Sequence, residues 1–160
     1  PRRGFVVLPV TDRDIADVSN RQAHVGGELA ARAALRISDE RLRELSVIHG
    51  ELVQAYAAND EDRAVRLNHE FHRAINVAAE SPKLAQLMSQ ITRYAPESVF
   101  PTIEGWPAKS VADHKRILLA LKARDVGKAR TAMADHLAAG ATPLTDHLLK
   151  QGVAQRVRQT

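Results

Sequence analysis

Residues 68–75, NHEFHRAI, place two histidines, an asparagine and a glutamate within about two turns of a predicted helix. Imidazole nitrogens and carboxylate or amide oxygens are the groups with which proteins bind Zn²⁺, Ni²⁺, Mn²⁺ or Fe²⁺. Residues four apart share one face of a helix, whereas neighbouring residues do not. The stretch therefore cannot close a metal site alone, and further ligands have to come from other parts of the chain.

A helical wheel of residues 61–79 separates these four candidate side chains. The apolar arc contains Ala64, Val65, Leu67, Phe71, Ile75, Ala78 and Ala79. Asn68 and His72 fall inside that arc, whereas His69 and Glu70 fall on the opposite, charged arc. We therefore expect Asn68 and His72 to point inward and the other two to face solvent.

Two later segments repeat this arrangement with one histidine each. In residues 110–124 His114 lies among Val111, Ile117, Leu118 and Leu121. In the segment that follows Asp125, His136 lies among Ala129, Ala132, Met133, Ala139 and Gly140. Three helices are thus expected to direct one histidine each into a common core.

A buried histidine is more often a hydrogen-bonded core residue than a metal ligand. His49 also falls on an apolar arc, and we interpret it as a core or polar-network residue. Burying three imidazoles without partners is costly, however, and one shared metal satisfies all three. Asn68, one turn before His72, is the candidate for a fourth ligand. Spacing alone leaves both the metal-bound and the metal-free interpretation open.

The inner faces of these helices show no clear Asp or Glu that could act as a general base. This absence counts against a hydrolytic metal enzyme. Such an enzyme would need a carboxylate from the predicted loop at 96–107, where Glu97 and Glu104 are the candidates.

Composition narrows the class of protein further. The 160 residues are 44% hydrophobic and 26% charged, which is typical of one globular domain. Cysteine is absent, which excludes disulfides and thiolate metal sites and suits a reducing cytoplasm. The net charge of +4 is weak evidence for nucleic-acid binding because basic and acidic residues alternate. No apolar run approaches the roughly 20 residues that cross a bilayer.

The periodicity predicts an all-α antiparallel bundle of about six or seven helices, preceded by a short extended segment at 5–10. The first helix is expected to have Asp12 or Asp14 as its N-cap, to reach about residue 37 and to break or kink at Gly26–Gly27. Later helices are expected at 38–58, 60–79, 80–95 and 110–124. The last begins after Asp125 and runs towards Leu149 with a bend at Pro143.

The motifs LNHEFHRAINVAAESPKL and DHKRILLALKARDVGKARTAMADHL resemble the FCD effector domain of the FadR subfamily of GntR transcriptional regulators. The opening RRGFVVLPVTDRDIADVSNRQ is similar to the end of the wing, the linker and the first effector helix of that family. The resemblance implies that residues 1–10 are the tail of an N-terminal winged helix-turn-helix domain. Residues 11–151 then form the FCD domain, and residues 152–160 a C-terminal tail. The chain starts at Pro1, and we expect it to be part of a longer protein.

The resemblance also implies a function and its site residues. Asn68, His72, His114 and His136 match the positions that hold a divalent metal, here zinc or nickel, with manganese or iron as alternatives. Asn68 stands where the family more often has Asp. Arg21 matches an arginine that could pair with an effector carboxylate. The implied protein is a cytoplasmic, homodimeric regulator that senses a small organic acid and binds operator DNA through the missing domain, and it is not an enzyme.

Two alternatives remain at this point. One is a mononuclear metal enzyme on a helical bundle, and the other is a metal-free dimerisation module with buried histidines. Turnover would identify the first, and the metal content of the purified protein would separate the second from the other two.

Overall fold

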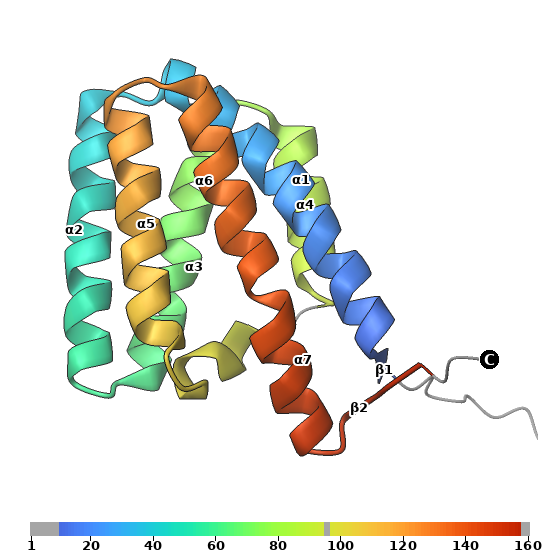
Figure 1. Cartoon of the computed structure of the whole chain (residues 1–160). Coiled ribbons are helices and arrows are strands. Elements are labelled where there is room, and N and C mark those ends of the chain that lie inside the picture. The colour runs from blue at the N-terminus through green and yellow to red at the C-terminus, as the bar shows by residue number, and fades with distance from the viewer. Residues whose placement is uncertain (1–9, 95–96, 158–160) are drawn as a thin grey trace, which may run out of the picture.

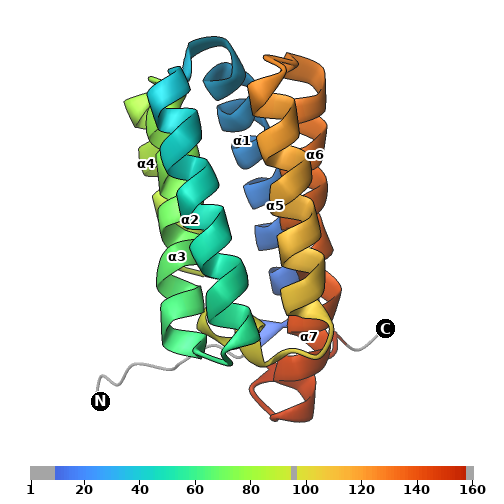
Figure 2. The ribbon, with the colours of Figure 1, turned by 90° about the vertical axis from the view of Figure 1, so that its left-hand side faces the viewer.

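The computed structural model describes residues 10–94 and 97–157, and these residues form the expected all-α bundle (Figure 1). The α-helices are α1 (Asp12–Arg36), α2 (Asp39–Ala57), α3 (Glu61–Ala78), α4 (Pro82–Thr92), α5 (Trp106–Lys122), α6 (Val126–Ala139) and α7 (Ala141–Lys150). Their axes run roughly along one direction, as the two perpendicular views show (Figure 2). The predicted fold class is confirmed.

Local capping signals set most helix starts. Ser38, Asp60 and Asp125 cap α2, α3 and α6, each accepting a hydrogen bond from the backbone N–H three residues later. The start of α1 differs from the prediction, because Thr11 is the N-cap. Asp14 completes a capping box by accepting a bond from the Thr11 backbone N–H at 2.9 Å.

Helix α1 continues without a break through Gly26 and Gly27, so the predicted interruption is wrong. Both glycines are buried where α1 packs against α6. A Cβ on Gly26 would collide with the Leu137 side chain, and one on Gly27 would lie 3.0 Å from the Arg130 carbonyl oxygen. The glycines therefore permit close helix packing rather than ending the helix.

Gly27→Ala is expected to lower the free energy of unfolding by about 1 kcal/mol or more, because the new methyl group meets the backbone of α6. The matched control is Gly50→Ala on exposed α2, where a Cβ meets nothing within 4 Å. There the gain in helix propensity is expected to stabilise the protein by about 0.5–1 kcal/mol. Urea denaturation measures both. If Gly27→Ala instead stabilised the protein, α1 and α6 would be able to move apart and accommodate the methyl group without loss of stability.

The last predicted helix is two helices, and the division falls at Gly140 rather than at Pro143. Pro143 lies in the first turn of α7, where a missing N–H costs little. The same proline cannot donate to the carbonyl four residues earlier, which explains why the uninterrupted helix stops upstream of it.

The predicted loop at 96–107 is shorter than expected. It contains a 3-10 helix, η1 (Glu97–Thr102), and Trp106 already begins α5. Phe100 and Trp106 stack with their ring centroids 4.5 Å apart, so this connection forms a packed wall below the bundle.

Two short strands, β1 (Val10–Thr11) and β2 (Ala154–Gln155), pair in parallel at the ends of the described chain. The Val157 N–H also donates to Asp12 Oδ1 at 3.0 Å. Most of the extended segment predicted at 5–10 lies outside the described residues. None of the helices in the described ranges is long and apolar enough to span a membrane.

Two hydrophobic cores matter for the site. The larger one fills the bundle between α1 and the helices around it, and includes Leu29, Phe71, Ile117 and Met133. A smaller core near the chain ends joins Ile15, Leu144, Leu148 and Ala154, with Phe100 packed against it.

Candidate metal centre and its cavity

His72, His114 and His136 meet as the sequence predicted. One ring nitrogen from each lies within 4.8 Å of the others, and the three residues come from α3, α5 and α6. His114 and His136 are buried and His72 is half-buried. The helical wheels placed all three correctly, and also His69 and Glu70, which are exposed.

The spacing of the nitrogens fits a first-row divalent ion. His114 Nε2 and His136 Nε2 lie 3.2 Å apart. Two imidazole nitrogens bound to one ion at about 2.0–2.1 Å are separated by roughly 2.8–3.4 Å at octahedral or tetrahedral angles. The residues present therefore fit a divalent metal.

Burial keeps two of the imidazoles neutral, which is the form that binds metals. The pKa of His72 and that of His114 are both held well below the usual histidine value, first by burial and then by the neighbouring histidine rings. Without a metal, the pair of Nε2 atoms can share at most one proton as a hydrogen bond, and His114 Nδ1 has no partner among the described residues. The cluster is thus poorly satisfied by protein groups alone.

Asp113 overturns the expectation that no carboxylate lies on the inner faces. Its side chain is only 5% exposed, and Oδ2 lies 3.3 Å from His136 Nδ1. Burial raises the pKa of Asp113, but hydrogen bonds from His136, Lys109 and Arg116 outweigh it and hold the pKa well below its usual range. An ionised acceptor at Nδ1 favours the tautomer of His136 that leaves Nε2 free for a metal.

The sequence shows the ion-pair partners of Asp113, but it does not show the contact between Asp113 and His136. Lys109 and Arg116, four residues before and three after it, form ion pairs with its two oxygens at 2.8 Å. These spacings are visible in the sequence. The contact with His136 is not, because it depends on how α5 packs against α6.

Asp113→Asn is expected to weaken metal binding by about 10- to 100-fold, since it removes the charged acceptor that orients His136. Competition with a metal chelator measures the affinity, and ¹⁵N NMR of the metal-free protein reports the His136 tautomer. Asp135→Asn is the matched control, because exposed Asp135 precedes His136 as Asp113 precedes His114. Unchanged affinity and tautomer in Asp113→Asn would contradict the assigned role.

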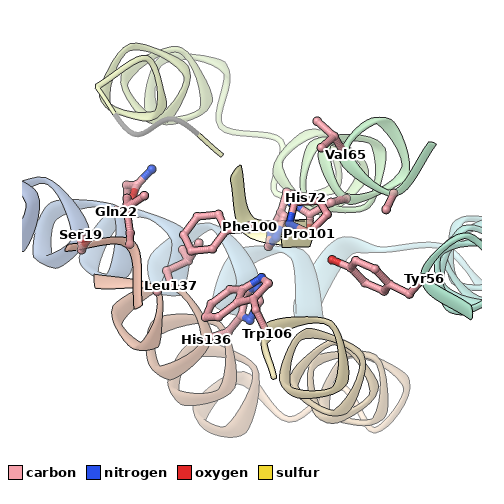
Figure 3. Close-up of a pocket in the computed structure, with 14 residues that line it drawn as sticks. Ser19, Gln22, Tyr56, Val65, His72, Phe100, Pro101, Trp106, His136 and Leu137 are labelled. Carbon is pink, nitrogen blue, oxygen red and sulfur yellow. The ribbon is translucent and has the colours of Figure 1, made fainter. Parts of the chain in front are cut away.

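His72 and His136 line a cavity that has about 600 Å³ of space when the open solvent at its mouth is included (Figure 3). His114 is not among its lining residues. Its lining residues come from six helices and η1: Ser19, Gln22, Tyr56, Ala64, Val65, Asn68, His72, Phe100, Pro101, Trp106, His136, Leu137, Gly140 and Leu144. The predicted fourth ligand, Asn68, is half-buried and lines the same cavity as His72 and His136. Its coordination of a metal stays a prediction.

Arg21 and His49 occupy different surroundings. Arg21 is exposed and is absent from the residues that line the cavity, so its pairing with an effector remains a prediction. His49 is half-buried, with its ring centroid 6.2 Å from that of His114 and its Nδ1 atom unpaired. His49 is therefore a core residue whose ring lies beside that of His114.

Ser19, Gln22 and Tyr56 line the cavity but were not predicted from the sequence. Ser19 and Gln22 follow Ile15 at helical spacing on the buried face of α1. That pattern of polar residues within an apolar face was the available signal. Tyr56 continues the apolar helical repeat of Leu45 and Leu52, so its own segment does not mark it as a cavity residue.

Comparison with known proteins gives a structural similarity and a family match. The fold is similar to that of E. coli McbR/YncC, with a TM-score of 0.79 and 22% identity over 92% of this chain and 75% of that chain. A search of curated proteins finds no match. The FCD domain model matches residues 19–139, which include all three histidines. FCD domains are effector domains of GntR-type transcription regulators, not enzymes, and metal binding is known among them. Since that match spans most of the sequence, the chain belongs to the FCD family.

Proposed function

We propose that this chain is the effector-sensing domain of a bacterial transcriptional regulator of the FadR subfamily, responding to a small organic acid bound over a divalent metal. The observation that carries the proposal is the meeting of three histidines from three helices beside one cavity, which His72 and His136 line. His72, His114 and His136, with Asn68 as the fourth candidate, would hold the metal. Zinc or nickel suits this donor set best, with manganese or iron as alternatives.

When bound, the metal supplies a positively charged centre to which a carboxylate oxygen of the effector can coordinate. The protein supplies the enclosure. The ring centroids of Trp106 and His136 lie 5.9 Å apart, and Trp106 also stacks on Phe100. These aromatic rings shield this side of the candidate metal centre from water. Asp113 holds His136 in place from the opposite side of the imidazole.

The cavity is also connected to the start of the domain. Phe100 and Leu144 line the cavity and belong to the smaller core, which contains Ile15 of α1 and Ala154 of β2. Ala154 pairs with Val10 of β1, directly after the residues proposed to lead to the DNA-binding domain. An effector that displaces Phe100 or Leu144 would thus shift the paired strands. In a homodimer, this shift would change the separation of two winged helix-turn-helix domains on operator DNA.

The proposal is tested by metal analysis of the purified protein, followed by thermal melting with a panel of organic acids. We expect about one divalent ion per chain, stabilisation by at least one acid, and loss of that stabilisation after chelation. An acid that is converted to product would instead identify a metal enzyme. A protein without metal whose melting no acid changes would be a dimerisation module.

A further inference from the structure

In the part of the chain that the structure describes, no permanently charged side chain lines the cavity. Among the described residues that line it, none is Asp, Glu, Lys or Arg. Arg21, the nearest basic residue along α1, is exposed while its neighbour Gln22 is buried. A metal would therefore be the single strong positive charge available to a ligand inside.

Two buried polar side chains of the cavity lack partners. Ser19 is 4% exposed and Gln22 is 5% exposed, and neither side chain makes a hydrogen bond to any described residue. They lie one turn apart on α1 and both line the cavity. Neither side chain has a fully buried polar atom, so their polar atoms are open to the cavity and available to a polar ligand group.

The polar groups lie at different sides of the cavity. Ser19 and Gln22 occupy the α1 side and Tyr56 the α2 side, with His72, Phe100, Trp106 and His136 between them (Figure 3). Burial raises the pKa of Tyr56, so its hydroxyl is neutral and can donate a hydrogen bond. Neutral donors and acceptors therefore flank the candidate metal centre.

This distribution of charge limits the ligand. One carboxylate can be neutralised by the metal, but a second anionic group among Phe100, Trp106 and Leu137 would lose its hydration without gaining a cation. Removing an ionised group from water costs several kcal/mol unless it is paired. A hydroxyl or carbonyl group has a much smaller cost and finds partners in Ser19 and Gln22.

We propose that the effector is a monocarboxylate with a neutral hydroxyl or carbonyl group at its other end, and that Ser19 and Gln22 bind this group. Dicarboxylates and phosphate esters are disfavoured, because no described residue that lines this cavity supplies a second cation. The inference rests on the proposed metal-dependent sensing and adds the chemical class of the ligand.

Two series of acids test the inference on the zinc-loaded protein by isothermal titration calorimetry. One series is butanoate, its terminal hydroxy derivative and succinate, and the other is hexanoate, its terminal hydroxy derivative and adipate. In the series whose length fits, the hydroxy acid is expected to bind about 3- to 10-fold more tightly than the plain acid. The dicarboxylate is expected to bind at least about 100-fold more weakly than the hydroxy acid.

Variants assign the neutral group to its partners. Gln22→Leu and Ser19→Ala should each reduce or remove the advantage of the hydroxy acid while leaving the plain acid within about 2-fold. Gln54→Leu, an exposed glutamine on α2, is the matched control and should change neither. Loss of binding by both acids in Gln22→Leu together with a lower melting temperature would indicate damage to the fold, and Ser19→Ala then decides.

The outcomes separate this inference from the proposed function. Equal or tighter binding of a dicarboxylate, or a hydroxyl advantage that survives both variants, would overturn the ligand class while metal-dependent sensing stands. Binding that persists unchanged after chelation would overturn the metal-centred function. Failure of every acid to bind the zinc-loaded protein would overturn both.

Discussion

Replacing His72 and His114 together by alanine is expected to abolish stoichiometric metal binding. Two of three imidazoles disappear, and His136 with Asn68 cannot hold a divalent ion at comparable affinity. Stabilisation by the metal should disappear with it. For a metal present at about 1,000 times its dissociation constant, this loss amounts to about 4 kcal/mol. Elemental analysis and thermal melting with and without added zinc measure both effects.

The folding of the double variant without metal is a second test of this prediction. Because burial disfavours the charged form of both histidines, their removal takes away polar groups that the core accommodates poorly. The double variant should therefore still fold. His69→Ala is the control from the same stretch, since His69 is exposed. Retention of one ion per chain by the double variant would show that the metal binds elsewhere.

Phe71→Ala is expected to lower the free energy of unfolding by about 3–5 kcal/mol, the largest effect of any single change considered. Phe71 is fully buried in the main core, and its ring stacks on His114 with a centroid distance of 4.1 Å and an interplanar angle of 8°. Truncation leaves a cavity beside the candidate metal ligand. Chemical denaturation measures the loss, and chelator competition should show weaker metal binding.

Val77→Ala on the same helix is the control for this prediction. Val77 is 54% exposed, so its truncation should change stability by less than about 0.5 kcal/mol. Phe71→Leu fills part of the space and should recover part of both stability and metal affinity. If Phe71→Ala destabilised the protein but left metal affinity unchanged, the stacked ring would have no role in holding His114.

The features that the sequence predicted correctly depend on interactions within a single helix. The inward direction of His72, His114 and His136 follows from the helical repeat and the apolar arc around each of them. Both features are properties of one helix and need no knowledge of its neighbours. The caps at Ser38, Asp60 and Asp125 are equally local, since each side chain bonds a backbone N–H three residues on.

The errors arose where two helices meet. Gly26 and Gly27 carry the sequence signal of a break, and their use as a contact surface depends on α6 lying against them. Asp113 sits next to a predicted inward histidine, and its burial depends on His136 approaching from another helix. Pro143 indicated a bend, whose position moved to Gly140 because the lost hydrogen bond lies upstream of the proline.

Only the packing of the helices against one another decides which side chains line the same cavity. Ser19, Gln22 and Tyr56 belong to helices that contribute no ligand to the three-histidine cluster, and nothing in their own segments relates them to the metal ligands. A helical repeat states which residues point inward on each helix. It does not state which inward residues of different helices meet, because that depends on the rotation, shift and separation of the helices. These are set by side-chain packing across the whole bundle.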